Sequence, residues 1–423
     1  MEKATSTART TVNSPNDVDL LESSQLKCPW PSYEVLREQA PVWEDPRTGH
    51  FIVSRFEDIR TVLLNPDIFV ANLSEGDDSE RPEVRALYEE KGMLPATSML
   101  GLNDPHHKQV RSLMDTAFRP KRVTEFEPYI EELCQRLLDR FIDRGEVDLS
   151  KEYAQEMPLL VMTRLMGVPE EDGHMIRRWT ESWLERISMK MTPEEEILSC
   201  EEEIAAQRYF QPIIERVRAN PEENLISDIV NGVVPEWGHG LSDNQIQIEI
   251  LVDMFTGGTA TSGHGITSAV KIWIDQPDVW EEVRSDPDKH LANFIEEVVR
   301  IDGPQQGDPR FAAVDTELSG VKIPKGTIVH PRWGAGNRDP RKFGASAAKI
   351  DLRRPQPRTH LGFGLGTHHC IGARLARRQM WYGLKTIIDN IDRMWLLDDD
   401  FEYVENYIVR GLKSLRIGFE KKQ

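Results

Sequence analysis

Near the carboxyl end of the chain stands FGLGTHHCIG, residues 363–372, and it is followed directly by ARLARRQMWYGLKTIIDN, residues 373–390. The second stretch carries apolar residues at spacings of three and four, which predicts a helix. Cys370 thus lies where a loop becomes a helix, among backbone N–H groups without helical partners and at the positive end of the helix dipole, which favours a thiolate. Gly364, Gly366 and Gly372 lack a Cβ and would let the backbone approach a flat group.

Three roles can be considered for Cys370. A buried structural cysteine is the ordinary one. Zinc fits poorly, because zinc ligands are usually spaced by two to four residues and no fourth ligand is evident beside His368, His369 and Cys370. The remaining role is a thiolate ligand of haem iron, which accounts for both the helix start and the glycines.

Composition sets the broad class of the protein. The chain has 423 residues and a formal charge of −19, which disfavours nucleic acid as a partner. Its four cysteines show no C-x-x-C spacing, so neither a disulfide framework nor a zinc knuckle is indicated. The polar start lacks a signal core or a membrane anchor, so we expect a cytoplasmic protein that does not bind membranes. We expect residues 1–18 to be disordered and residues 19–423 to form a single domain.

Helical patterns dominate, and the fold class is predicted to be mainly α with small β-sheets. Strand signals are short: residues 50–54, a hairpin over residues 317–331 that turns at Pro-Lys-Gly, and residues 411–419. The longest helix is predicted to begin after Ser242, an N-cap with Gln245 in capping-box spacing, and to run until Pro277 stops it. Its middle contains Gly257, Gly258 and two further glycines, which indicates either close helix packing or a bulky flat group beside it.

The motif around Cys370 closely resembles that of the cytochrome P-450 superfamily of haem-thiolate monooxygenases, F-x-x-G-x-[HR]-x-C-x-G. The resemblance extends from about Pro29 to the C-terminus and is to the soluble bacterial type. It implies the cytochrome P-450 fold, with haem b (iron protoporphyrin IX) held between the long central helix and the helix that follows Cys370. By this resemblance Cys370 is the metal ligand, and the other cofactor-binding residues are His107, Arg111, Arg310, His368, Phe363, Gly364, Gly366 and Gly372.

Two further family patterns occur in the expected order. FIEEVVR contains the E-x-x-R pair Glu297 and Arg300, and GNRDP supplies Arg338, which the resemblance makes the third member of a buried ion-pair triad. PHHKQVR contains the H-x-x-x-R pair, His107 and Arg111, which in the family meets the haem propionates. A lone E-x-x-R would be only a pair on a helix surface.

The GGTAT stretch of the long helix corresponds to the family's oxygen-activating segment. Its catalytic positions are Gly257, Gly258, Ala260 and Thr261; Ala260 stands where relatives carry an acid and Thr261 where they carry a threonine. A register one residue earlier, with Thr259 at the acid and Ala260 at the alcohol, fits the glycines less well. Because alanine cannot relay protons, we expect altered proton delivery. Ordered water, Thr259, Thr261 or His264 could serve instead, although ordinary packing of His264 is favoured.

The resemblance also implies a reaction and its partners. One oxygen atom of O2 enters a small or medium organic substrate, by hydroxylation or O-demethylation, with electrons from a separate [2Fe–2S] or other ferredoxin and an NAD(P)H-dependent reductase. Arg374, Arg377 and Arg378 indicate either a basic docking patch or merely solvated helix arginines. A peroxide-driven or oxidative-coupling enzyme and a non-catalytic haem module remain alternatives. The predicted substrate-pocket residues are Gln305, Gln306, Tyr407 and Ile408.

Overall fold

A computed structural model of the chain describes residues 12–73 and 81–422. Residues 1–11, most of the segment expected to be disordered, lie outside the described residues. Pro15–Asp17, however, forms a 3-10 turn and Val18 is buried, so the expectation of disorder is wrong for residues 12–18. Across residues 12–73 and 81–422, no helix combines the length and the apolar character needed to cross a membrane.

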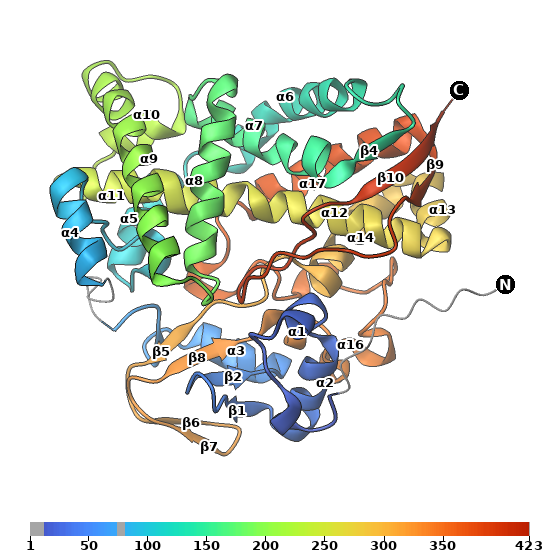
Figure 1. Cartoon of the computed structure of the whole chain (residues 1–423), viewed down its shortest axis with the longest axis horizontal. Helices are drawn as coiled ribbons and strands as arrows, with labels where there is room; N and C mark the ends of the chain where they lie inside the picture. Colours follow the sequence, from blue (N-terminus) through green and yellow to red (C-terminus); the bar gives the residue numbers. More distant parts are fainter. Residues whose placement is uncertain (1–11, 74–80, 423) are drawn as a thin grey trace.

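Helices form the larger part of the molecule and lie above a smaller region of strands in Figure 1. The largest buried apolar cluster is built mainly from helices α6, α7, α9, α12, α14 and α17. Helix α12 runs through the middle of the view and contacts α7, α13, α14 and α17. The helices of this layer are α4 (Pro82–Lys91), α5 (His106–Met114), α6 (Pro120–Asp139), α7 (Glu156–Met166), α8 (Gly173–Arg186), α9 (Pro193–Ala219), α10 (Leu225–Asn231), α11 (Asp243–Ile248), α12 (Ala260–Asp275), α13 (Pro277–Ser285), α14 (Pro287–Asp302) and α17 (Ala373–Asn390).

Within the described residues the strands form three small sheets. The largest has the order β1-β2-β8-β5-β3, in which only β2 and β8 are parallel; the others are β4-β10-β9 and β6-β7. Short helices α1 (Ser23–Lys27), α2 (Trp30–Gln39), α3 (Phe56–Leu64), α15 (Trp333–Gly336) and α16 (Pro340–Phe343) belong to the same part of the fold. The strands are β1 (Val42–Glu44), β2 (Phe51–Val53), β3 (Phe69–Val70), β4 (Glu146–Asp148), β5 (Arg310–Ala312), β6 (Thr316–Leu318), β7 (Val321–Ile323), β8 (Ile328–Pro331), β9 (Ile391–Leu396) and β10 (Arg416–Lys421).

The predicted hairpin turns at a different place. Leu318 pairs with Val321, so the tight turn is Ser319–Gly320, and both residues have the positive φ of a left-handed conformation, 49° and 81°. The Pro-Lys-Gly segment instead connects β7 to β8, which belong to different sheets. The sequence does not indicate a turn at Ser319, because glycine and asparagine favour a positive φ far more than serine does.

The predicted long helix is not one continuous α-helix. After α11 the segment Glu249–Thr256 is π-helical, and Thr259, with φ −103° and ψ −73°, departs from ideal helix angles within the right-handed region before α12 begins. Two threonine hydroxyls accompany the change, since Thr256 donates to the carbonyl of Leu251 at 2.8 Å and Thr261 to that of Gly257 at 2.9 Å. Such bonds from hydroxyls to the helix backbone tend to bend helices.

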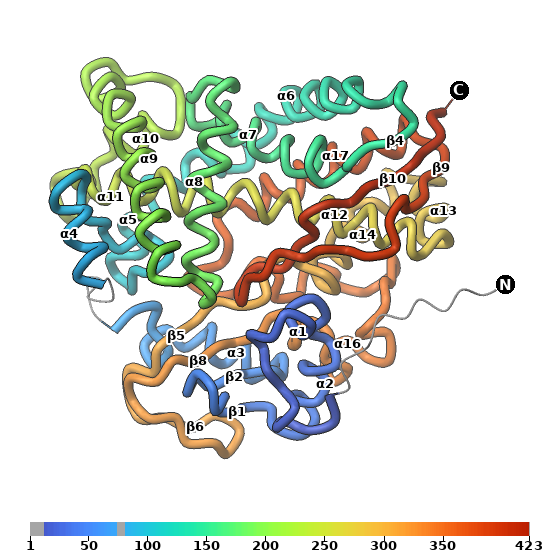
Figure 2. Tube along the Cα trace, viewed as in Figure 1, coloured from blue at the N-terminus to red at the C-terminus, as the bar shows by residue number. Residues whose placement is uncertain are grey.

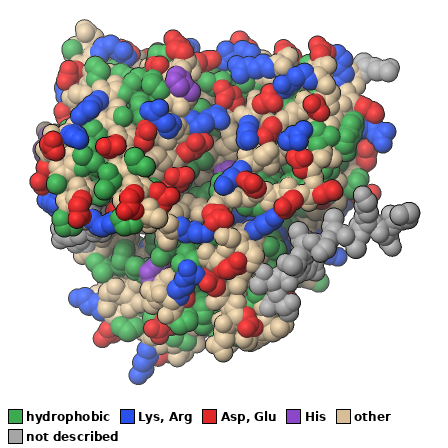
Figure 3. Space-filling view, viewed as in Figure 1, with side chains coloured by type: hydrophobic (Ala, Val, Ile, Leu, Met, Phe, Trp, Pro, Cys, Tyr) green, Lys and Arg blue, Asp and Glu red, His purple; other side chains and the backbone are tan. Residues whose placement is uncertain are grey.

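The C-terminal segment between β9 and β10 crosses the middle of the molecule in Figure 2. It meets the chain that follows α14: the N–H of Gln306 donates to the carbonyl of Ile408 at 2.8 Å, and Gln305 pairs with Val409 in a β-bridge. On the face seen in Figure 3, acidic and basic side chains are interspersed, so the net negative charge is not gathered into one patch there.

Candidate active site

The cysteine loop is closed by a backbone hydrogen bond. The N–H of Cys370 donates to the carbonyl of Phe363 at 2.8 Å, and Gly364 and Gly366 between them have φ values of +68° and +74°. Glycine adopts these angles without strain. At Gly366 a Cβ would also come within 2.6 Å of the Leu63 carbonyl oxygen. These two glycines therefore shape the loop, whereas their closeness to a flat ligand stays a prediction.

The Cys370 thiol lies at the start of α17, as predicted. Burial raises its pKa, and hydrogen bonds from the backbone N–H groups of Gly372 and Ala373, with nearby Arg111 and Arg377, only partly oppose this. The prediction that the helix start by itself lowers the thiol pKa is therefore wrong. A metal cation at the sulfur would provide the missing stabilisation, since a coordinating thiol is deprotonated outright.

Cys370 is accessible although neighbouring chain surrounds it closely. The residue is solvent-accessible, yet it is surrounded closely enough for burial to dominate its pKa, a combination that fits a side chain bordering an internal space. A Cβ on Gly372 would make ordinary van der Waals contacts, 4.0 Å from the sulfur and 3.9 Å from Phe118. Because the residue is accessible, its sulfur can bind a ligand that is not part of the chain.

Four cationic or potentially cationic side chains gather beside this loop. The rings of His107, from α5, and His368 have centroids 4.0 Å apart. Burial and then the charges of Arg310, His107 and Arg111 lower the pKa of His368 to about 2. Because Arg310 belongs to β5 and the other two residues to α5, both elements lie close to the cysteine loop. Thr367 links them further, since its hydroxyl lies 3.3 Å from Nδ1 of His107 and its carbonyl accepts from Arg111 at 3.4 Å.

This cluster suits a dianionic cofactor with a thiolate-bound metal. Arg310 and Arg111 have carboxylate neighbours, Asp308 and Asp115, and repulsion between nearby positive groups and a protonated His368 adds to burial in lowering the pKa of that ring. Two carboxylates of a haem would relieve that repulsion through charge-assisted hydrogen bonds. The donor set therefore fits the predicted group, with Cys370 as the sulfur ligand and the four side chains as carboxylate partners.

The glycines of the central helix divide into two kinds. Gly258 and Gly263 approach neighbouring chain, since a Cβ would lie 2.9 Å from Met162 and 2.5 Å from Gln155. Gly257, in contrast, is exposed and a Cβ there would meet nothing nearer than 3.8 Å. Ala260 and Thr261, next to it along the chain, are partly exposed. Of these glycines, Gly257 is therefore the one that fits an adjacent bulky ligand.

His264 does not face this open stretch. Its Nδ1 lies 2.9 Å from Nε2 of Gln155, and its ring packs so closely on Gly411 that a Cβ there would come within 2.0 Å. Burial and then the charge of Arg410 lower its pKa to about 4, so the ring is neutral at pH 7. Packing, the favoured interpretation of this histidine, agrees with these contacts.

The ion-pair triad has a different third member from the one predicted. Arg300 Nε and Arg354 Nε lie 2.7 and 2.8 Å from the same oxygen of Glu297. Arg338 makes no ion pair with Glu297 among the described residues; it donates to the carbonyl of Ile301 at 3.0 Å and stacks on Trp30. Arg354 reaches the carboxylate because the coil after α16 folds back over α14.

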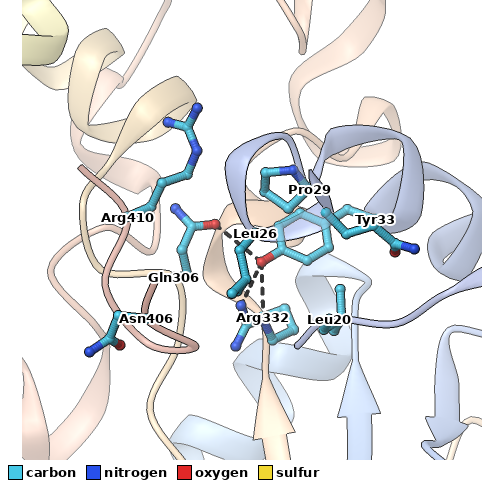
Figure 4. A pocket seen from close by; sticks show the side chains of 9 residues that line it. Leu20, Leu26, Pro29, Tyr33, Gln306, Arg332, Asn406 and Arg410 are labelled. Atoms are coloured by element: carbon cyan, nitrogen blue, oxygen red, sulfur yellow. Dashed lines mark hydrogen bonds between the residues drawn. The ribbon is translucent and has the colours of Figure 1, made fainter. Parts of the chain in front are cut away.

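Two of the four predicted pocket residues have other roles. The Gln306 amide accepts from the Tyr33 hydroxyl at 3.2 Å and donates to the carbonyl of Gly303 at 2.7 Å. Tyr407 is fully buried, with the Arg332 guanidinium 4.6 Å from its ring centre. Both are thus held by packing around Arg332 and not free to bind substrate. Figure 4 shows Gln306, Tyr33 and Arg332 lining a small pocket with Asn406, Arg410 and several apolar side chains.

Gln305 is the predicted pocket residue whose side chain can still bind a substrate. It is partly exposed, and its Nε2 donates to the carbonyl of Gly307 at 2.9 Å. Its amide oxygen has no hydrogen bond in the described ranges, and Ile408 is buried next to it in the same pair of segments. Sequence reasoning missed Arg332, whose importance depends on contacts with Tyr33 and Tyr407 from opposite ends of the chain.

Comparison with known proteins agrees with this geometry. The model of the cytochrome P-450 family matches residues 179–393, so the chain belongs to that family of haem-binding monooxygenases, and haem b is its cofactor. The chain is 29% identical over 394 residues to a Bacillus subtilis cytochrome P-450 named YjiB, covering 92% of this chain and 93% of the relative. It is 27% identical over 390 residues to the steroid C26-monooxygenase of Mycobacterium tuberculosis, covering 92% and 93%.

Solved structures show the same fold. The cytochrome P-450 CREJ, in complex with (4-ethylphenyl) dihydrogen phosphate, aligns with a TM-score of 0.86 at 25% identity, over 93% of this chain and 98% of that one. The predicted cytochrome P-450 fold is therefore confirmed, as are the enzyme class and the need for O2, redox partners and an organic substrate.

Proposed function

We propose that this enzyme inserts one oxygen atom of O2 into a small or medium organic molecule, by hydroxylation or O-demethylation, with electrons from a separate ferredoxin and reductase. The observation that carries the proposal is the Cys370 thiol, which accepts hydrogen bonds from backbone N–H groups at the start of α17 and is accessible to a ligand. When bound there, haem b supplies the iron at which O2 is activated. The chain contributes the sulfur and the cationic cluster of His107, Arg111, Arg310 and His368.

Fewer arginines are free to bind an electron donor near the cysteine loop than the sequence predicts. Arg377 pairs with buried Glu296, and Arg378 pairs with Glu127. Arg374 is exposed. We therefore restrict the proposed ferredoxin contact near the cysteine loop to Arg374, since an arginine whose charge is already paired attracts an acidic partner less strongly.

The thiolate assignment has a direct test. The reduced carbon monoxide complex of the wild-type protein should absorb at the wavelength diagnostic of a thiolate ligand, and Cys370→Ala should lose that band. Cys28→Ala is the matched control, because it removes an exposed thiol elsewhere in the fold. A normal band in Cys370→Ala would refute the assignment.

A second assay separates the proposed reaction from its alternatives. Purified enzyme is given candidate substrates with ferredoxin, reductase and NADPH, and separately with hydrogen peroxide alone. Product in the first mixture is expected. Product only with peroxide would favour a peroxide-driven enzyme, and binding without turnover in either mixture would favour a haem module.

We also propose that Gln305 binds a polar group of the substrate through its amide oxygen. The substrate found by screening for displacement of the iron-bound water should bind more weakly to Gln305→Val than to the wild type. Unchanged affinity would remove Gln305 from the pocket.

A further inference from the structure

One face of the central helix stays accessible inside the protein. Between Ile246 and Val270 the residues that are not buried are Asp253, Gly257, Gly258, Ala260 and Thr261. Residues 253, 257 and 261 follow one another at intervals of four, so they share a helix face. The segment packs against α7, α8, α14 and α17, so it lies within the layer of helices. A carboxylate, Asp253, therefore shares the face that carries the oxygen-activating position.

Asp253 has a second carboxyl group beside it. Glu249 stands one turn earlier, is only 1% exposed, and accepts the N–H of Met99 through Oε1 at 2.7 Å. Its Oε2 and the Oδ2 of Asp253 are buried without a hydrogen-bond partner in residues 12–73 and 81–422. No Lys, Arg or His in those ranges forms an ion pair with either residue.

The pair is short of positive charge. Burial raises the pKa of both groups, and their closeness raises that of Glu249 further, as expected of two carboxyls that share a proton. The backbone N–H groups of Leu100 and Met99 and the Ser98 hydroxyl oppose this rise at Asp253 only in part. A buried carboxylate without a cation is costly. A positive group of a ligand would supply that compensation through a charge-assisted contact.

We propose that Glu249 and Asp253 form a binding site for a cationic nitrogen of the substrate. This inference rests on the proposed function and specifies its substrate class: an amine or quaternary ammonium compound, anchored away from the carbon that is oxidised. Eight residues separate Asp253 from Thr261, which at ~1.5 Å per residue places the nitrogen roughly 12 Å from the oxygen-activating position. That separation suits a substrate lying along the helix face.

The same separation argues against a direct proton route from the pair to oxygen. A hydrogen bond joins heavy atoms about 3 Å apart, so several ordered waters would be needed in line. Binding of a cation needs no such chain. A role of the pair in proton transfer is therefore an alternative outcome of the experiment.

The test compares two probes on the haem-loaded enzyme by titration calorimetry. One probe is (8-hydroxyoctyl)trimethylammonium, and the other is its uncharged carbon isostere, 9,9-dimethyldecan-1-ol. The quaternary nitrogen has no lone pair and cannot coordinate iron, so any preference reports the protein. We expect the cation to bind the wild type at least about tenfold more tightly than the isostere.

The variants are Asp253→Asn, Glu249→Gln and the double substitution, with Asp278→Asn as control because Asp278 is an exposed carboxylate on α13. The preference for the cation should disappear in the double variant and persist in the control. Equal affinities in the wild type, an unchanged preference in the double variant, or an equal loss in the control would each overturn the proposal.

Two further measurements separate this inference from the proposed function. The reduced carbon monoxide band should be the same in all four variants, which shows that haem ligation by Cys370 is intact whatever the probes do. If the cation preference survives while product formed per NADPH falls in Asp253→Asn, the pair serves proton delivery and the binding proposal is wrong.

Discussion

Nε of Arg354 lies 2.8 Å from the Oε1 of Glu297, the oxygen that also accepts from Arg300 at 2.7 Å. All three side chains are buried, and Arg354 also donates to the carbonyl of Phe343 at 3.0 Å. The contact thereby fastens the coil after α16 onto α14, in the stretch that leads to the cysteine loop.

Arg354→Met should consequently cost stability. It leaves the Glu297 carboxylate with half of its positive neighbours, and we expect the free energy of unfolding to fall by roughly 3 kcal/mol in urea denaturation. Arg338→Met is the matched comparison, because Arg338 has no carboxylate partner among the described residues and should cost less. Equal losses would restore Arg338 to the triad.

Glu296 gives a pH dependence of known sign. Burial alone would raise its pKa, but hydrogen bonds from His360 and Arg377 lower it from 4.5 to about 2. Because the folded-state pKa is the lower one, the stabilisation is complete above pH 4.5 and is lost as pH falls toward about 2. Glu296→Gln should lower the free energy of unfolding by about 2 to 3 kcal/mol near pH 7.

The difference between wild type and Glu296→Gln should narrow measurably at about pH 4, because the unfolded carboxylate then binds protons. Urea denaturation at both pH values measures it. Glu57→Gln removes an exposed carboxylate paired with Arg60 and should change little at either pH. A difference for Glu296→Gln that widened on acidification would contradict the assigned direction.

Gly411 and His264 provide a packing test. A Cβ on Gly411 would lie 2.0 Å from Nδ1 of His264, so Gly411→Ala should destabilise the protein by about 1 to 3 kcal/mol through overpacking. Adding His264→Ala should recover part of that loss, and a double-mutant cycle measured by thermal or urea unfolding gives the coupling. Strict additivity of the two changes would show that the ring and Gly411 do not constrain each other.

The missing acid at Ala260 bears on coupling of NADPH use to product. Ala260→Asp places a carboxylate next to Thr261, and it should change the solvent isotope effect and the product formed per NADPH. If both stayed as in the wild type, the missing acid would have no mechanistic consequence.

Thr261→Ala is the complementary change. In the structure the Thr261 hydroxyl donates to the Gly257 carbonyl, which leaves its oxygen able to accept. Its loss should raise hydrogen peroxide release, measured against NADPH consumed. Unaltered release would favour the register with Ala260 at the alcohol position, or a hydrogen bond supplied by the substrate.

Local signals in the sequence predicted the helices, the position of Cys370 and the meeting of His107 with His368, because each depends on spacing or on a motif. The partner of Glu297 could not be found this way, since Arg354 is 57 residues away and only the folded coil brings it close. The predicted pocket role of Gln306 and Tyr407 was wrong for the same reason, because both side chains pack in the interior around Arg332. The Glu249 and Asp253 pair gave no signal, because acidic residues on a helix usually face solvent.

In the π-helical segment Glu249–Thr256, the number of residues in each turn decides which way the side chains point. A π-turn holds one residue more than the α-turn it replaces, and a residue in an α-helix subtends about 100°. Deletion of one residue there would let the segment rewind as ordinary α-helix with little change of phase, whereas rewinding with all its residues kept would turn the residues before it by about that angle relative to Thr261. Asp253 would then leave the face that it shares with Thr261 without any change in composition, so the phase of this helix, and not only its amino acids, sets which side chains a substrate meets.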